Sequence, residues 1–401
     1  MKIAFLSSIY PSHCNLIYKK KSRLDKMSYD DQNNFIRHET ICSMGEWPNY
    51  LKNLGFESIM LCRNNFVLQD KWCIENDFIP QTNDIEFEII LEQTKRFNPD
   101  ILFIFGASYY AQDNKLERLV SKCSHIKKKV CWYGAPEGNE AIFQHYDLVL
   151  TNSIKLRDSL RQKKIISEQL NHAFESKTLS FLSNRAKENK ICFAGSLIPE
   201  DQWHTERIDL LEDLADKVDI EIYSDISKLS FKNCVLKKSY QVRHKISKLV
   251  SKVSKNNPKI NFYSNPLNLP SFSYFENSPI KRKIQKPSWG IDMLQNLSDF
   301  LITFNMHIAQ TGDHACNMRL FESTGVGCCL LTDYKQDIKK LFLIDDEIVT
   351  YRTKEEAIEK SKFLLGNPKE AAKIGLAAQK RTLKDHNTEK QVNLLLYYLK
   401  V

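Results

Sequence analysis

Arg319 and Glu322 are the residues whose types and spacing point most directly to chemistry. They stand three positions apart within residues 317–327, a segment that predicts a short helix ending at glycines and leading into a buried apolar strand. On such a helix the cation and the carboxylate lie on one face. At the edge of a sheet they predict a ligand site, and the alternative interpretation is a surface ion pair worth under about 1 kcal/mol.

The segment upstream supplies the elements that would position this pair. Residues 298–305 predict a strand, which is followed by a polar loop through Gly312 and by a helix beginning near residues 313–315. Open parallel sheets bind ligands where loops leave the carboxyl ends of their strands. A helix that begins there directs unpaired N–H groups into the crevice, which predicts a seat for a diphosphate.

The same alternation of strands and helices occurs twice along the chain. The first run contains predicted strands at 2–7, 58–62, 100–106, 128–133 and 147–151 and predicted helices at 33–54 and 86–97. The second run begins with a strand at 190–194, the Gly195-Ser196 turn, a helix at 206–214 and a strand at 220–223. Alternation of this kind predicts an α/β fold built from two Rossmann-like domains with parallel sheets.

The restart of the pattern near residue 190 suggests the domain organisation. We expect an N-terminal Rossmann-like domain over residues 1–172 and a polar connector over 173–189. A C-terminal Rossmann-like domain then covers 190–385, with a basic insertion at about 226–288, and residues 386–401 form a C-terminal helix. The length of 401 residues also favours two domains over one.

The net charge of +9 is concentrated in the basic insertion. Residues 239–255 combine lysines with apolar residues at helical spacing, which predicts an amphipathic basic helix. One interpretation is contact with a membrane surface, and the other is a domain helix with a solvated lysine face. No nucleic-acid-binding module accompanies this helix, so no nucleic-acid partner is expected.

The lengths of the apolar runs and the positions of the cysteines predict where in the cell the protein is found. No apolar run has the length of a membrane span, and the short run after Met1 is not followed by a cleavage site. The eleven cysteines lie mostly in apolar runs and form no Cys-x-x-Cys pair, which fits a reducing compartment. We therefore expect a cytoplasmic protein, with peripheral contact at the inner face of the membrane as an open alternative.

Residues from Trp289 to about 390 resemble the donor-binding domain of GT-B glycosyltransferases of the family 4-like, group 1 kind, which includes spore-maturation-protein-like and O-antigen-biosynthesis members. The N-terminal half matches more loosely, through the opening strand and residues 68–72. The segments that carry the resemblance are 289–294, 301–307, 317–327, 341–342, 346–351, 374–375 and 386–388. The resemblance implies a GT-B fold, in which two Rossmann-like domains face each other across a cleft.

The resemblance also implies roles for individual residues. The family has a Glu-x7-Glu pair that contacts the donor sugar and the ribose; Glu322 matches the second Glu, whereas His314 stands at the first position beside Asp313. Asp313, His314 and Arg319 are therefore the catalytic candidates. The further donor-binding candidates are Asn305, His307, Asn317, Gly195, Ser196 and Arg207. The alternatives are a structural loop cap for Asn305 and His307, a turn without a ligand for Gly195 and Ser196, and an exposed first-turn arginine for Arg207. No metal ion is expected as a cofactor, because in this family protein cations and dipoles stabilise the leaving diphosphate.

On the acceptor side, four polar residues lie near predicted strand exits or helix ends. These candidates are Glu46, Ser108, Tyr133 and Glu137. Aromatic faces and carboxylates suit carbohydrates, and a structural role in the core is the alternative for each.

The predicted function is transfer of a sugar from a nucleotide sugar to a glycan or lipid-linked saccharide, in cell-surface polysaccharide synthesis. Two alternatives stay open, a nucleotide-sugar 2-epimerase of the same architecture and a catalytically inert binding relative. The absent first Glu favours the inert relative. Retention or inversion at the anomeric carbon is open as well.

Overall fold

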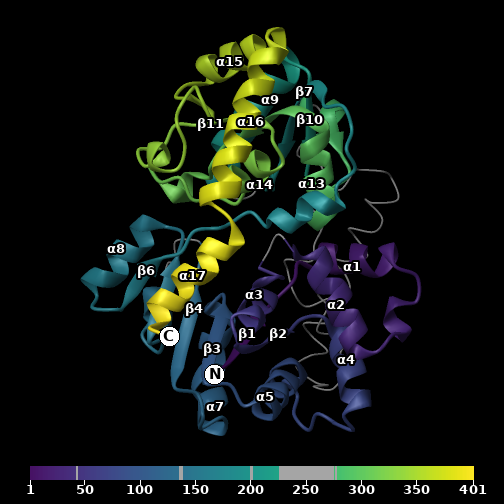
Figure 1. Cartoon of the computed structure of the whole chain (residues 1–401), viewed down its shortest axis with the longest axis vertical. Coiled ribbons are helices and arrows are strands. Elements are labelled where there is room, and N and C mark those ends of the chain that lie inside the picture. Colours follow the sequence, from purple (N-terminus) through teal and green to yellow (C-terminus); the bar gives the residue numbers. More distant parts are fainter. Residues whose placement is uncertain (42–43, 135–138, 199–201, 225–274, 276–277) are drawn as a thin grey trace.

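The computed structural model describes residues 1–41, 44–134, 139–198, 202–224, 275 and 278–401. Within these residues the chain forms two six-stranded parallel sheets, each in its own unit, and the units are stacked one above the other (Figure 1). We call them the lower unit, which holds the first sheet, and the upper unit, which holds the second. This is the α/β architecture with two Rossmann-like units that the sequence predicts.

The first sheet has the strand order β2-β1-β3-β4-β5-β6. Its strands are β1 (Lys2–Ser7), β2 (Glu57–Cys62), β3 (Ile101–Phe105), β4 (Lys128–Trp132), β5 (Leu148–Thr151) and β6 (Ser167–Gln169). Because the order reverses beside β1, the chain leaves β1 and β3 on opposite sides of the sheet. A crevice forms at their carboxyl ends, which is where open α/β sheets bind ligands.

The second sheet repeats this arrangement with the order β12-β11-β10-β7-β8-β9. Its strands are β7 (Glu188–Ala194), β8 (Ile220–Tyr223), β9 (Ile284–Gln285), β10 (Phe300–Asn305), β11 (Cys329–Asp333) and β12 (Val349–Tyr351). The order reverses between β7 and β10, so the loops after these two strands border the crevice of the upper unit.

Helices cover both sheets, which is why the strands are almost continuously apolar. All six residues of β10 and the four central residues of β1 are buried. The helices of the lower unit are α1 (Pro11–Lys20), α2 (Tyr29–Glu39), α3 (Trp47–Asn53), α4 (Phe66–Glu75), α5 (Ile85–Phe97), α6 (Ser108–Ala111), α7 (Lys115–Lys122) and α8 (Ile154–Gln162). The helices that follow α8 in the described part of the chain are α9 (Thr205–Lys217), α12 (Ile280–Lys283), α13 (Gly290–Asp299), α14 (Arg319–Gly325), α15 (Lys354–Gly366), α16 (Pro368–Asp385) and α17 (Thr388–Leu399).

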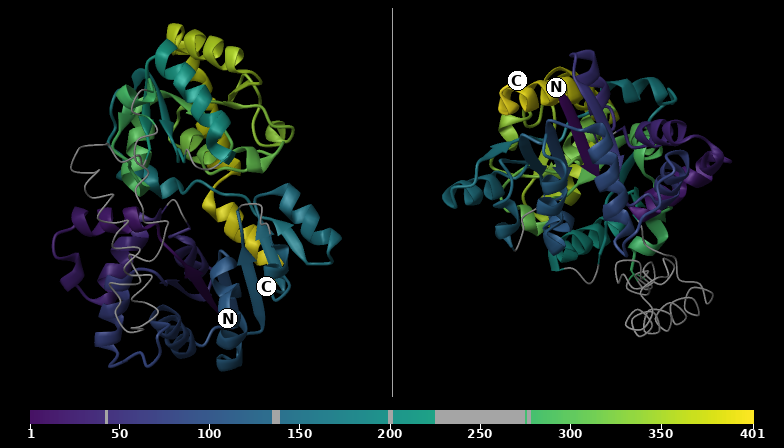
Figure 2. Two further views of the ribbon diagram at one scale, coloured as in Figure 1. Left: turned by 180° about the vertical axis from the view of Figure 1, so that it is seen from behind. Right: turned by 90° about the horizontal axis from the view of Figure 1, so that it is seen from below.

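The chain crosses between the units twice, and the two crossing segments are hydrogen-bonded to each other. The backbone N–H of Phe174 donates to the carbonyl of His386 at 2.9 Å, and that of Thr388 donates to the carbonyl of Phe174 at 3.2 Å. After the second crossing, α17 packs on the lower unit, where Leu395 joins the core cluster that contains Ile3 (Figure 2). The residue limits given above for the two domains stay a prediction.

Membrane-spanning helices and clusters of metal ligands would each indicate a particular class of protein. None of the helices in the described part of the chain has the length and apolar character that crossing a bilayer requires. Nor do three or more His, Cys, Asp or Glu side chains converge there as a metal site would need.

The predicted single helix over residues 33–54 is wrong. Helix α2 ends at Glu39, and a separate helix, α3, begins at Trp47 with Pro48 in its first turn, a position that suits proline because its missing N–H would be unpaired there. Between them, Gly45 packs against the carbonyl oxygen of Arg37, where a larger residue would not fit.

The helix predicted to begin near residues 313–315 begins later, at Arg319. The N–H groups that would start it are engaged elsewhere: Ala315 donates to the carboxylate of Asp337 at 2.8 Å, and Cys316 donates to the His307 ring at 3.3 Å. The predicted diphosphate seat at the earlier helix start is therefore not formed as expected. The amphipathic basic helix expected at 239–255 lies outside the described residues.

Candidate functional site

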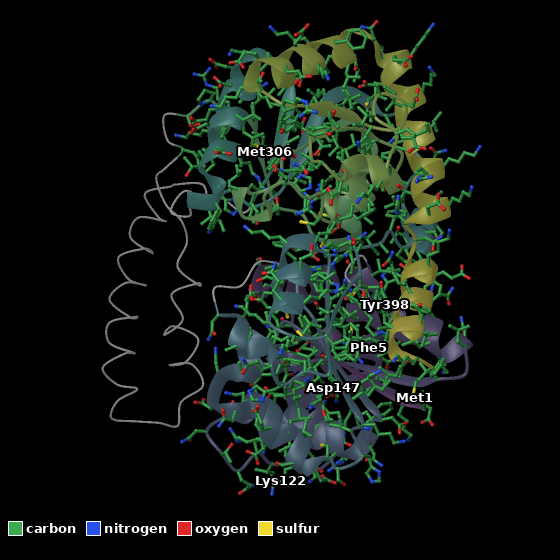
Figure 3. The ribbon with its side chains drawn as sticks, turned by 90° about the vertical axis from the view of Figure 1, so that its left-hand side faces the viewer. Met1, Phe5, Lys122, Asp147, Met306 and Tyr398 are labelled. Atoms are coloured by element: carbon green, nitrogen blue, oxygen red, sulfur yellow. The ribbon has the colours of Figure 1, made fainter. Side chains whose placement is uncertain are left out.

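The carboxyl edge of the second sheet brings most of the predicted donor-site residues together. The loop after β10 covers residues 306–318 and leads into α14, while the loop after β11 covers residues 334–337 and runs beside it. Met306, at the start of the first loop, lies in the upper unit (Figure 3). This is the edge at which the sequence places the ligand site.

Arg319 and Glu322 form the ion pair that their spacing allows, at 2.8 Å. The pair is not on the surface, because the side chains are only 13% and 6% exposed. Arg319 also donates from Nε to the carbonyl of Ala194 at 3.1 Å, which ties α14 to the end of β7. Burial raises the pKa of Glu322, and the neighbouring guanidinium opposes that effect. The first turn of α14 thus holds a desolvated cation beside a carboxylate.

Asn305 and Asn317 connect this helix to the strand ends. The Nδ2 of Asn317 donates to Oδ1 of Asn305 at 2.8 Å, and Nδ2 of Asn305 donates to the Thr332 hydroxyl at 2.8 Å. Oδ1 of Asn317 is buried and has no hydrogen-bond partner within the described residues. The predicted pair of asparagines is therefore assembled, with one acceptor still unused.

His307 is buried and clamps the two loops together. Its Nε2 accepts from the Cys316 N–H, so its Nδ1 carries the proton and donates to Asp333 at 2.8 Å. Asp333 also pairs with Lys335 at 3.1 Å. Burial raises the pKa of Asp333, but the contacts with His307 and Lys335 more than offset this and hold it well below the ordinary value. His307 thus acts on loop geometry in this structure.

Asp313 and His314, the two candidates for the absent Glu, contact the loop after β11. Asp313 is exposed and accepts from the Gln336 side chain at 3.2 Å. His314 is half-buried and its Nδ1 lies 3.2 Å from Asp337 Oδ2. Among the described residues, neither contacts the Arg319–Glu322 pair. Both therefore lie on the loop that leads into α14 and are tied to the loop after β11.

Arg207 is buried in α9, whereas the sequence left open an exposed first-turn arginine. Its guanidinium donates to the carbonyls of Ser196 at 3.2 Å and Met306 at 2.6 Å, which bridges the loops after β7 and β10. Its Nε has no partner within the described chain. Burial lowers the pKa of Arg207 to about 10. Gly195 lies beside it, against the Phe193 ring.

The four acceptor candidates are not all brought together. Ser108 and Tyr133 meet, with their hydroxyl oxygens 3.1 Å apart. Glu46 is buried and binds Lys177 at 3.3 Å and Asn49 at 3.1 Å, so its carboxylate is already engaged by the connector and by α3. Glu137 lies outside the described residues.

The main feature that the sequence interpretation missed is a cavity of about 500 Å3 at the carboxyl edge of the first sheet. It includes the ends of β1 to β4 and side chains from α1 and α2. Missed lining residues that carry polar chemistry are His13, Asn33, Arg37 and His172. The Tyr10-Pro11 sequence just after β1 is a loop signal at a strand exit and was available to locate the cavity.

The cavity reaches the upper unit at the start of α14, which we call the donor helix because the sequence predicts a donor site there. Met318, which immediately precedes Arg319, contributes to the cavity wall together with Ala173 and Thr388 of the crossing segments. Beside it, the side chain of Asn152 after β5 donates to the carbonyl of Cys316. The two sheet edges therefore border one continuous region between the units.

Comparisons with known proteins agree with this arrangement. Residues 243–397 match the family described as Glycosyl transferase-like. No curated protein shows significant sequence similarity. Among solved structures, HepE of Anabaena in complex with UDP-glucose has a TM-score of 0.58 at 10% identity, covering 100% of this chain and 99% of that one.

Two further solved structures share the fold over the whole length. Sucrose-phosphate synthase of Thermosynechococcus elongatus has a TM-score of 0.56 at 9% identity, with 100% of this chain and 98% of that chain covered. A glycosyltransferase of Rickettsia africae has a TM-score of 0.55 at 12% identity, with coverage of 100% and 97%. The fold is GT-B. Residues 243–397 are similar to the glycosyltransferase-like family.

Proposed function

We propose that this chain transfers a sugar from a nucleotide sugar to a glycan or lipid-linked saccharide in cell-surface polysaccharide synthesis. The observation that carries the proposal is the buried Arg319–Glu322 pair, which begins directly beyond the cavity wall at Met318. The solved HepE structure, which shares the fold, is a complex with UDP-glucose. A donor on the upper edge and an acceptor in the cavity would meet between the units.

In the proposed reaction, the bond between the anomeric carbon and the diphosphate oxygen breaks and the nucleoside diphosphate leaves. The acceptor hydroxyl forms the new bond to that carbon and gives its proton to the leaving diphosphate. Charge develops on the leaving diphosphate, so a preorganised cation lowers the barrier. Arg319 supplies this cation, while Glu322 accepts hydrogen bonds from the ribose hydroxyls.

Asp313 and His314 are proposed to contact the sugar hydroxyls, since both lie on the loop that precedes the donor helix. Asn317 offers an unused buried acceptor on the same loop, and Asn305 holds it in place. The unused Nε of Arg207 is a second donor for the diphosphate. With these cations in place we propose transfer without a metal cofactor, for which unchanged turnover in the presence of EDTA is the test.

We also propose that the protein acts in the cytoplasm and contacts the inner face of the membrane through residues 239–255, because lipid-linked acceptors are presented there. Each lysine near an anionic surface contributes about 1 kcal/mol of attraction. Co-sedimentation with phosphatidylserine vesicles should therefore fall when Lys245, Lys248, Lys252 and Lys255 are replaced by Glu. Co-sedimentation equal to that of the unmodified chain would remove the membrane from the proposal.

The experiment that tests the function is incubation of the purified chain with UDP-, GDP-, ADP- and dTDP-sugars, followed by product analysis. Slow release of free sugar and nucleoside diphosphate is expected from one donor, because water replaces the absent acceptor. An epimerised sugar would indicate a nucleotide-sugar 2-epimerase instead. Binding of a donor with no turnover, even with acceptor extracts, would indicate the inert relative.

A further inference from the structure

The cavity of the lower unit has an unusual chemistry for a site that binds only neutral sugars. Its volume of about 500 Å3 is that of a small-ligand pocket. Apolar side chains form most of the wall, among them Ile36, Met60 and Phe105. Asp and Glu are absent from the described lining residues, and Arg37 is the only lysine or arginine among them.

Arg37 is held in place by two hydrogen bonds and forms no ion pair with a described residue. Its Nε donates to the carbonyl of Gly45 at 3.1 Å, and its Nη2 donates to Asn49 Oδ1 at 2.9 Å. Its Nη1 makes no hydrogen bond to any described residue. Glu46 is nearby, yet its carboxylate is engaged by Asn49 and Lys177, so no ion pair with Arg37 forms in the described chain. Burial lowers the pKa of Arg37, and Glu46 opposes this.

The two histidines of the wall do not change the charge of the cavity at neutral pH. Burial lowers the pKa of His13 to about 4; by smaller amounts, Asp292 raises this pKa and Lys20 lowers it. Burial likewise lowers the pKa of His172 to about 4. Among the described lining residues, Arg37 is therefore the only side chain that is charged at neutral pH, in surroundings where Coulomb interactions are stronger than in water.

From this arrangement we propose that the cavity binds its ligand through an anionic group, a phosphate or a carboxylate, which pairs with Nη1 of Arg37. This inference rests on the proposed function in one respect: if the chain transfers a sugar, the ligand of the cavity is the acceptor. Hydrogen bonds between a guanidinium and an anionic oxygen are roughly twice as strong as those between neutral groups. A neutral saccharide would leave the half-buried guanidinium of Arg37 without an ion-pair partner among the described residues. The apolar wall near Met60 and Phe105 packs against the uncharged part of the ligand.

The test compares two probes that differ in charge, phenyl phosphate and phenyl β-D-glucoside, with the intact chain. Binding is followed by the fluorescence of Trp47 and Trp132, which line the cavity. We expect phenyl phosphate to bind at least about ten-fold more tightly than the glucoside, a difference of roughly 1.4 kcal/mol. In Arg37→Gln the affinity for phenyl phosphate should fall by about ten-fold, while that for the glucoside stays unchanged.

Two control variants test whether the change in affinity is specific to the charge of Arg37. Lys122→Gln removes the same charge from an exposed position at the foot of the lower unit, away from the upper unit, and should bind both probes as the unmodified chain does (Figure 3). Arg37→Lys keeps the charge and should bind phenyl phosphate more tightly than Arg37→Gln. Equal affinity of the unmodified chain for both probes would overturn the proposal even if Arg37→Gln failed to fold.

A folded Arg37→Gln variant with full affinity for phenyl phosphate would also overturn it, since the phosphate would then be bound elsewhere, for example on the donor edge. Competition separates two sources of the anionic group: displacement of phenyl phosphate by vesicles of phosphatidylcholine with phosphatidic acid, but not by phosphatidylcholine alone, indicates a lipid headgroup. Absence of displacement indicates a soluble anion. Neither assay uses a nucleotide sugar, so failure of the proposed transfer reaction would be seen separately.

Discussion

The carboxyl edges of the two sheets border the same region, but they differ in how many of their charged side chains form ion pairs. On the upper edge, two groups of buried charges are paired, Arg319 with Glu322 and Asp333 with Lys335 and His307, while Arg207 donates to two backbone carbonyls. On the lower edge the cavity wall is largely apolar, and Arg37 forms no ion pair with a described residue. The difference suggests that the upper edge is a preorganised polar network, whereas the lower edge is completed by the charge of its ligand.

The largest effect is expected from breaking the pair on the upper edge. Arg319→Ala should lower the free energy of unfolding by about 3–5 kcal/mol, because it leaves the carboxylate of Glu322 buried and unpaired. Turnover should fall by about 100-fold or more, since the leaving diphosphate loses its cation. Urea unfolding and donor hydrolysis rates measure the two effects.

The double variant Arg319→Met/Glu322→Leu is the control for this prediction. It removes both charges, so most of the stability should return while the activity stays low. If Arg319→Ala were as stable as the unmodified chain, the pair would not be the desolvated pair described above, and the contrast between the two edges would fail.

The second prediction uses the apolar character of the lower edge. His13 is 8% exposed, and burial lowers its pKa from 6.5 to about 4. Between these pH values the unfolded chain binds a proton that the folded chain does not, so stability should fall as the pH decreases from 6.5 to 4. A change of this size in one pKa corresponds to about 3 kcal/mol.

Urea unfolding at several pH values checks this. In His13→Gln the dependence of stability on pH within this window should be weaker by up to about 3 kcal/mol. His145→Gln, at an exposed position, serves as the matched control. Identical pH profiles for His13→Gln and the unmodified chain would contradict the prediction, because they would mean that water reaches His13 and that burial does not lower its pKa.

The smallest effect concerns the segment that joins the two edges. A methyl group on Gly325, in the donor helix, would overlap the ring of Phe174 in the first crossing segment. Gly325→Ala should therefore lower the free energy of unfolding by about 1–3 kcal/mol. Gly366→Ala is the matched control, because no atom lies within 4 Å of its added methyl group and it lies in a helix, so it should be neutral or stabilising by about 0.5–1 kcal/mol. Equal effects of both changes would mean that Phe174 does not hold the crossing segment against α14.

The strands and the fold class were predictable because parallel strands are buried on both faces. The strand at Ile220–Tyr223 occurs at the predicted residues, and that at Lys190–Ala194 begins two residues earlier, at Glu188. The break between α2 and α3 was missed because apolar periodicity continues across it, although Pro48 and Gly45 were visible in the sequence. Element types follow from local patterns, whereas breaks depend on single residues.

The candidate site was predictable in its composition but not in its contacts. The spacing of Arg319 and Glu322 indicated a shared face, yet their burial depends on packing against the end of β7. The late start of α14 depends on Asp337, which is 22 positions from the N–H group that it binds, and no local pattern reveals such a bond. Arg37 was missed for a similar reason, since its cavity is formed by four strand ends that are distant in the sequence.

The central claim is that the first turn of α14 binds the donor. Its most direct test is calorimetric titration of the nucleotide sugar identified by the hydrolysis panel against the unmodified chain, Glu322→Gln and the control Glu359→Gln, which changes an exposed carboxylate on α15. We expect Glu322→Gln to weaken binding by about 10- to 150-fold, because hydrogen bonds to a charged acceptor contribute about 1.5–3 kcal/mol, and we expect Glu359→Gln to bind normally. Full donor affinity in a folded Glu322→Gln variant would contradict the claim.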